Sequence, residues 1–385
     1  MRNQFAFFPV LFLVLTAQNS AADDFRVITN ASVRGEYNDN IFFSRDNKVD
    51  DFITTASMGI QVRERTERLS ALLKCRIDGL DYADNDELND IEEYYDGRVS
   101  YQVNPLMKFS GQARYTVDSR PDRDIDVTGY IFNTDVRRQQ HYSLSTDYQA
   151  SEKIAFFSSY SYQDDQFEVD DNDTYTGQNF VVGLSRSLDF TKPTTARLNA
   201  RYSSYDFFSS KVENYKLTVG FSRNVNEKLS YIMDIGPRHT EVRVKGTGYT
   251  ADDDGMGGRF TLTFKEEFTT AEMNFFHEIS GSSGRDGVTK RTGLAFSLKR
   301  RLGERSFARM SVDGYLNTAD RDTAFSDDLD ELTTTLNPSL HYEFNRDLSC
   351  EAAYRYSVSK DREDDYERHR NMIFLKLMYQ FPVVE

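Results

Sequence analysis

The residues with the clearest chemical potential in this sequence are arginines and lysines that recur two or four positions apart. Lys74 and Arg76 form one such pair, and Arg197 and Arg201 form another. In a β-strand this spacing places both side chains on one face of the sheet. Guanidinium groups bind carboxylate and phosphate oxygens through paired hydrogen bonds, so a face of this composition favours anions.

The candidate site residues are the basic side chains that alternate with apolar residues along the predicted strands. Acidic residues of the same parity are fewer, although the formal net charge of the whole chain is −15. Two interpretations stay open: a net basic wall that attracts anionic solutes, or a polar interior whose charges pair across strands. The candidate set is Arg34, Arg63, Lys74, Arg76, Arg98, Lys108, Arg114, Arg197, Arg201, Arg238, Arg259, Lys265, Arg309 and Arg355.

Other reactive residue types show no catalytic or metal-binding pattern. The five histidines lie far apart without HExxH spacing, and no Cys/His cluster has the spacing of metal ligands. Cys75 and Cys350 fall on well-separated predicted strands, so we expect two free thiols that act as small apolar residues. The sequence therefore predicts no catalytic residues, no metal and no cofactor, and the protein is not expected to be an enzyme.

The elements that would carry the basic residues are strands of alternating polarity. From Tyr94 to Val103, apolar and small residues occupy one parity and polar residues the other, and Leu106 to Val117 repeats the pattern after Asn104-Pro105. Period-two alternation is the signature of a strand with two different faces. Short turns on one side and long loops on the other are typical of an outer-membrane barrel.

The sequence predicts an all-β fold, a single antiparallel transmembrane β-barrel of about 18 strands. The even number, with both chain ends on the short-turn side, fits this architecture, and a count of 16 stays open. The predicted strands are 26–37, 53–64, 69–82, 94–103, 106–117, 139–150, 154–164, 176–188, 195–205, 214–225, 229–242, 257–267, 270–279, 291–302, 306–317, 331–344, 348–358 and 370–381.

Hydropathy and aromatic content agree with this fold. No internal apolar run reaches the length of a membrane-spanning helix, and the mean hydropathy is −0.64. A search for long apolar runs does not detect barrel strands, because lipid-facing and lumen-facing residues alternate in them. The chain has no Trp but 23 Tyr and 29 Phe, many near predicted strand ends, such as Tyr37, Tyr82, Tyr101 and Tyr354. Aromatic rings with a polar tip favour the lipid headgroup level.

The two chain ends resemble an export signal and an assembly signal. Arg2 precedes the apolar run Phe5 to Ala17, and Ser20-Ala21-Ala22 offers small residues before Asp23. This pattern predicts a signal peptide over residues 1–22 and a barrel over 23–385. The last predicted strand alternates apolar residues and ends in Phe381, as terminal strands of outer-membrane barrels do, although four residues follow it.

The predicted loops are acidic, and one of them is a candidate constriction. We expect acidic loops at 84–93, 164–174, 251–255, 319–331 and 360–367, none with the spacing of an EF-hand calcium site. The longest loop, 118–138, either folds inward to narrow the pore or extends beyond the membrane as a hairpin. Its candidate constriction residues are Arg120, Asp122, Arg123, Asp124 and Asp126.

The most specific motif follows the first predicted strand and runs from Tyr37 to Phe42 (YNDNIF). A strand ending in Tyr-x-Asp-Asn-(Ile/Val)-Phe resembles the opening of outer-membrane proteins of the beta-barrel porin 2 type. The chain is also similar to those proteins in its length, in its regular succession of hairpins and in its terminal strand. This similarity extends along nearly the whole mature chain. The resemblance implies a link to exopolysaccharide or capsule export loci, as in many of those proteins, but it implies no functional residues.

These features together predict a passive outer-membrane conduit in a Gram-negative bacterium, for export of acidic exopolysaccharide. The alternatives are a general or anion-preferring diffusion porin and a plugged structural barrel. The chain contains no GxxxxGK[ST] nucleotide-binding loop, so the driving force for export would come from elsewhere. The expected partners are outer-membrane lipid, the barrel-assembly machinery and a periplasmic polysaccharide-export partner; no nucleic acid is expected to bind.

Overall fold

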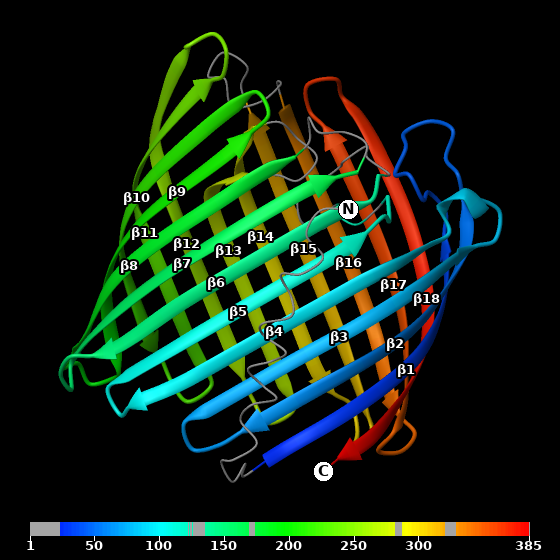
Figure 1. Ribbon diagram of the computed structural model, residues 1–385, viewed down its shortest axis with the longest axis horizontal. Helices are drawn as coiled ribbons and strands as arrows, with labels where there is room; N and C mark the ends of the chain where they lie inside the picture. Colours follow the sequence, from blue (N-terminus) through cyan, green and yellow to red (C-terminus); the bar gives the residue numbers. More distant parts are fainter. Residues whose placement is uncertain are drawn as a thin grey trace.

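The computed structural model describes residues 24–121, 123, 125, 135–168, 174–281, 287–319 and 329–384. Within these residues, eighteen antiparallel strands form one closed sheet, because β1 pairs with both β2 and β18 (Figure 1). The predicted all-β barrel of about 18 strands is confirmed. The predicted signal peptide, residues 1–22, lies outside the described residues.

Every predicted strand corresponds to one observed strand. No helix in the described part of the chain is long and apolar enough to cross a membrane. A 3₁₀ turn, η1, spans Asp86–Leu88. The strands are β1 Asp24–Asn38, β2 Asp51–Arg65, β3 Leu69–Tyr82, β4 Asp90–Asn104, β5 Met107–Asp118, β6 Arg137–Gln149, β7 Ile154–Phe167, β8 Tyr175–Leu188, β9 Thr194–Phe207, β10 Ser210–Asn224, β11 Leu229–Val244, β12 Thr250–Lys265, β13 Thr269–Gly281, β14 Val288–Arg301, β15 Ser306–Ala319, β16 Leu329–Glu343, β17 Leu348–Asp361 and β18 Tyr366–Val384.

One predicted loop is wrong. Residues 251–255 belong to β12, where Asp252 pairs with Glu241 and Asp253 with Thr240 of β11. Asp and Gly disfavour strands in general, but cross-strand partners override that preference here. The Arg238 guanidinium lies 2.7 Å from the carboxylate of Asp253, so an aspartate-rich segment continues the sheet.

The two ends of the barrel differ in how the chain reverses. At one end, here called the turn end, connections are short: 66–68, 105–106, 150–153, 189–193, 225–228, 266–268, 302–305 and 344–347. Asn226 and Asn345 each accept two backbone N–H groups there, at 2.8 to 2.9 Å. These Asx turns start the next strand. The opposite, loop end carries most of the longer connections, and both β1 and β18 have their free ends at the turn end (Figure 1).

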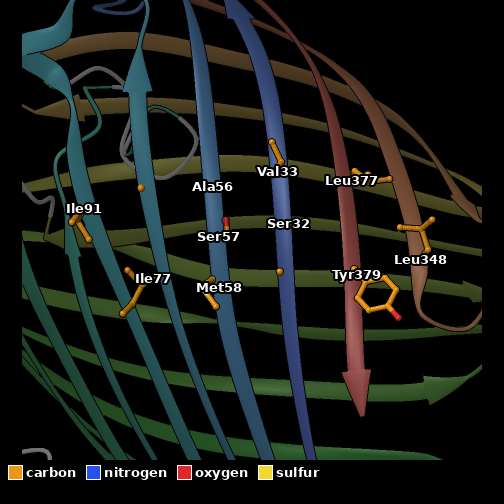
Figure 2. Close-up of a pocket in the computed structure, with 12 residues that line it drawn as sticks. Ser32, Val33, Ala56, Ser57, Met58, Ile77, Ile91, Leu348, Leu377 and Tyr379 are labelled. Carbon is orange, nitrogen blue, oxygen red and sulfur yellow. The ribbon is translucent and has the colours of Figure 1, made fainter. Parts of the chain in front are cut away.

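The outward face of the barrel is apolar. Met58 is 74% exposed and Leu375 is 62% exposed. Figure 2 shows part of this face, where Val33, Met58 and Ile77 project from neighbouring strands around a shallow apolar hollow. So much exposed apolar surface is unstable in water and suits a hydrocarbon surrounding.

The predicted aromatic residues divide between the two faces. Tyr37, Tyr101 and Tyr354 are outward and at least 38% exposed. Tyr82 is instead 3% exposed, because on β3 it shares the inward parity of Leu80. It packs with Ile41 and other buried residues of the loop end.

Two inner apolar clusters lie at the loop end. One joins Ile53 of β2, Leu80 and Tyr82 of β3, and Ile41 of the loop between β1 and β2. The other, in β8–β14, contains Tyr175, Phe207, Val212, Val242, Ile279 and Val288. The loop end of the interior is therefore packed, whereas no such cluster lies at the turn end among the described residues.

The Tyr37–Phe42 motif holds the first and last strands together. The Asp39 carboxylate accepts hydrogen bonds from the backbone N–H of Asn371 at 2.6 Å and from its side-chain amide at 2.7 Å. The side-chain amide of Asn40 donates to the carbonyl of His369 at 2.9 Å. We call these contacts between Asp39–Asn40 and His369–Asn371 the seam clasp. The motif was identified in the sequence, but nothing in the sequence indicated this contact.

Candidate functional site

The strand register places every residue of the candidate basic set on the parity opposite to the exposed apolar side chains. On β1, for example, Arg34 lies opposite Lys376 of β18, while the neighbouring Val33 faces outward opposite Leu377. The same relation holds along the other strands that carry the set. These side chains thus share the inner wall, and their role in solute passage stays a prediction.

Exposure divides the candidate set into three groups. Arg34, Lys108, Arg197 and Arg355 are half-buried, and Arg238 is buried. The remainder are exposed to the interior, mostly along the middle and the turn end of the barrel. They are Arg63, Lys74, Arg76, Arg98, Arg114, Arg201, Arg259, Lys265 and Arg309.

Part of this wall is paired with acids. Asp96 lies 2.7 Å from Arg98 and 3.4 Å from Arg114, and Asp234 lies 2.8 Å from Arg197. Exposed pairs of this kind neutralise charge locally but hold side chains only weakly. Both interpretations of the inner wall therefore apply, each to different residues.

Another part of the wall has no acidic neighbour within ion-pair distance. Among the described residues, no ion pair involves Arg63, Lys74, Lys108, Arg201, Lys265 or Arg309. Their positive charge is not cancelled by a directly bound carboxylate. The middle and turn end of the inner wall consequently carry a positive surplus that a dissolved anion would meet.

The loop end is different, since its inward charges are buried and paired. Arg137 binds Asp118 through two hydrogen bonds, at 2.9 and 3.1 Å, and Arg368 lies 3.0 Å from Glu331. Arg291 donates to the side-chain oxygen of Asn317 at 2.8 Å. The basic residues Arg137, Arg291, Arg368 and Arg370 were missing from the predicted set. Arg291 and Arg370 begin predicted strands and share their inward parity, whereas Arg137 and Arg368 lie outside the predicted strands, so alternation alone does not identify them.

The described part of the loop between β5 and β6 lies against the inner wall. Arg120 lies 2.8 Å from Glu36, which is wholly buried on β1. Arg123 lies 5.4 Å above the ring of Phe167, and Ile125 is 1% exposed. These contacts favour the inward interpretation of this loop over the external hairpin. Asp122, Asp124 and Asp126 lie outside the described residues, so the constriction itself stays a prediction.

The histidines do not form a catalytic arrangement in the part of the chain that the structure describes. His239 lies 2.8 Å from Asp254 on the outward face, and His277 lies 2.8 Å from the Thr292 hydroxyl. Among the described residues, no three His, Cys, Asp or Glu side chains are placed to hold a metal ion. Cys75 and Cys350 are free thiols.

Comparison with known proteins gives structural neighbours but no family. No protein-family model matches the chain, and no curated protein matches it. The outer membrane protein OpdK of Pseudomonas aeruginosa is 10% identical, with 92% of this chain and 99% of that chain covered at a TM-score of 0.44. OccAB3 of Acinetobacter baumannii is 10% identical, with 93% and 99% covered at 0.47.

OccK2 (OpdF) of Pseudomonas aeruginosa is a third neighbour, 8% identical, with 94% of this chain and 99% of that chain covered at a TM-score of 0.47. Likeness at this level of identity and superposition assigns neither a family nor a solute. The resemblance of the Tyr37–Phe42 motif to porin 2 type proteins therefore stays a prediction.

Proposed function

We propose that this protein is a passive pore of the Gram-negative outer membrane. The observation that carries the proposal is the opposite character of the two faces of one closed sheet: apolar outside, charged and hydroxylated inside. A closed sheet leaves no unpaired backbone edge in lipid, and alternation gives the wall a lipid face and a water face. The described interior contains no arrangement suited to catalysis, so transport of solutes is the function that this architecture supports best.

The proposed solute class is anionic. Arg63, Lys74, Arg201, Lys265 and Arg309 contribute positive charge along the inner wall without an ion-paired acid among the described residues. A cation-lined passage raises the local concentration of anions and lowers that of cations. Because the surplus lies in the exposed part of the wall, it acts on any solute that passes.

The finer proposal is export of an acidic exopolysaccharide, with anion-preferring diffusion as the alternative. The Tyr37–Phe42 motif and the basic wall support export, since an acidic polymer would meet several basic side chains in succession. Export would also need a periplasmic partner that supplies the polymer. In this proposal residues 1–22 direct the chain to the periplasm and the barrel-assembly machinery inserts it.

The first experiment is single-channel conductance of the refolded full-length protein in a planar lipid bilayer. We expect stable ion current, with a reversal potential in a KCl gradient that indicates anion preference. Acidic oligosaccharides should block the current at lower concentration than neutral ones of equal length. Cation preference would contradict the anionic solute class while leaving the pore intact.

A plugged structural barrel is the second candidate, and the packed loop end favours it. Ile41, Phe43 and Ile125 are each at most 2% exposed within the interior. A folded barrel that gives no conductance would support this candidate and exclude the pore. Correct folding is checked separately by the altered electrophoretic mobility of the unheated protein.

A further inference from the structure

The outward face of the barrel has a second apolar hollow, and a charged side chain lies in its lining. This hollow has a volume of about 750 Å³ and extends over β1, β2 and β14–β18. Exposed apolar side chains such as Leu340 and Leu375 stand around it. The charged side chain is Arg300 of β14, which is exposed and of outward parity, whereas Arg309 in the same lining has inward parity. The hollow shown in Figure 2 has no charged residue in its described lining.

The strand register shows that the second hollow follows one row of paired residues across six neighbouring strands. From β14 to β1, each member lies opposite the next: Arg300, Ala308, Leu340, Ala352, Leu375 and Gly35. The alanines and the glycine leave space between the larger side chains. Arg300 is the end of this row on β14, so the positive charge lies at one end of an apolar path.

The row rises from the turn end of the barrel toward the loop end. Arg300 precedes the last residue of β14 at the turn end, whereas Gly35 lies near the loop end of β1. Six strands spaced about 4.8 Å apart span about 24 Å. With strands tilted by about 40°, such a row rises by about 15 Å, which is about half of a hydrocarbon core of about 30 Å. An acyl chain along the row would therefore extend through one leaflet of a bilayer.

Arg300 lies within ion-pair distance of no carboxylate in the part of the chain that the structure describes. Glu266, in the turn between β12 and β13, is bound by Lys228 at 2.5 Å, and Arg300 acts on it only from a greater distance. A guanidinium group binds a phosphate through two parallel hydrogen bonds. A phosphate at the headgroup level of the turn end would thus meet an available donor where the hollow begins.

We propose that this hollow binds one anionic phospholipid of the periplasmic leaflet, with its phosphate at Arg300 and an acyl chain along the row toward Gly35. The leaflet follows from the proposed outer-membrane location, because short turns of such barrels face the periplasm. The proposal rests on that location and does not depend on conduction.

Charge complementarity favours this occupant over two others. A zwitterionic headgroup also carries an ammonium group, for which Glu266 offers little because Lys228 already binds it. A second copy of the chain would bring its apolar outward face against Arg300, and a charge buried without an acid costs free energy. An anionic lipid satisfies the apolar path and the charge together.

The test is native mass spectrometry of the refolded full-length protein in detergent, titrated with phosphatidylglycerol or with phosphatidylethanolamine. One phosphatidylglycerol should bind more tightly than further copies and more tightly than phosphatidylethanolamine. Arg300→Gln should weaken this first binding event by about fivefold, the effect of one basic residue near an anionic lipid surface. Ala352→Leu fills the middle of the hollow and should weaken the same event several-fold without changing the charge.

The matched controls are Arg186→Gln and Ala200→Leu. Arg186 is an exposed outward arginine near the turn end of β8, and Lys153 binds its neighbouring acid, Asp189, at 2.5 Å. Ala200 is an exposed outward alanine of β9. Neither residue lines the hollow, so both variants should bind phosphatidylglycerol as the unaltered protein does. Equal weakening by Arg186→Gln would mean that any basic residue at the rim attracts the lipid, and would overturn the site.

Three other results would also overturn the proposal. Equal affinity for phosphatidylethanolamine, or unchanged affinity in Arg300→Gln, would overturn the anionic class. A dimer that Ala352→Leu disrupts, with no preferred lipid, would assign the hollow to a second copy of the chain. Altered electrophoretic mobility of the unheated protein checks that each variant is folded.

Failure of the lipid site and failure of the pore are distinguishable because mass spectrometry needs no current. A conducting barrel without a preferred lipid overturns the site alone. A barrel that gives no conductance but binds phosphatidylglycerol with the dependence on Arg300 and Ala352 supports the site and excludes the pore.

Discussion

The loop half and the turn half of the inner wall contain the same residue types, but these residues differ in burial and in pairing. At the loop end, Arg137 and Asp118 are both buried and joined by two hydrogen bonds. Nearer the turn end, Arg98 is 53% exposed beside Asp96, and Arg309 is exposed without an ion pair among the described residues. Burial, not composition, therefore separates charges that hold the barrel together from charges that are proposed to act on a solute.

This difference has a physical cause in the connections. Long connections bring side chains such as Phe43 and Arg120 inward, and these cover the inward residues of neighbouring strands. Short turns have too few residues to cover the inward side chains of neighbouring strands. Charges that are buried must pair, because an unpaired buried charge costs far more free energy than an exposed one.

The largest expected loss of stability comes from a substitution in the loop half. Arg137→Met leaves Asp118 buried, with Arg123 at 3.5 Å as its remaining ion-pair partner among the described residues. We expect the free energy of unfolding to fall by about 3 kcal/mol. The measurement is urea unfolding in lipid vesicles, followed by tyrosine fluorescence. Arg114→Met in the more exposed mid-wall pair with Asp96 is the control and should cost less than about 1 kcal/mol. Equal losses in the two variants would abolish the distinction between buried and exposed ion pairs.

The next effect concerns the seam clasp. Asp39→Ala removes the acceptor of two hydrogen bonds from Asn371 and should lower the free energy of unfolding by about 1–3 kcal/mol. Asp46→Ala in the same loop is the control, because Asp46 is 80% exposed and its partner Arg45 is 3.6 Å away. If Asp39→Ala unfolds at the same urea concentration as Asp46→Ala, the clasp contributes nothing to closure of the barrel.

A functional effect without a stability effect is expected in the turn half. Replacing Arg63, Lys265 and Arg309 together by Gln should lower the anion-to-cation permeability ratio on the order of twofold, since surface charge sets the local ion concentration. The free energy of unfolding should change by less than about 0.5 kcal/mol per site. An unchanged reversal potential in a KCl gradient would show that these residues do not act on permeating ions.

Alternation along the chain was enough to predict the strands and the inward parity of the basic residues. It could not predict burial, because covering residues come from distant segments: Phe43 lies 5.8 Å below Arg370, which is far away in sequence. The same limit concealed that Arg34 of β1, Arg76 of β3 and Arg355 of β17 line one inner cavity. Composition alone predicts a loop at aspartates 252–254, because it takes no account of their partners on β11.

The smallest effect lies outside both halves, at the rim of the turn end. Lys153 lies 2.5 Å from Asp189, and this hydrogen bond holds the pKa of the Asp189 carboxyl below its ordinary value. A depressed pKa stabilises the folded state above the unfolded pKa, and that contribution is lost as pH falls through the folded pKa. Both side chains are well exposed, so the contribution is small.

The measurement is urea unfolding at about pH 6 and at about pH 3. Between these two pH values, Lys153→Met should lose slightly less free energy of unfolding than the unaltered protein. A larger loss in Lys153→Met would contradict the assigned direction and would make this exposed pair an exception to the rule that burial decides what a charge contributes.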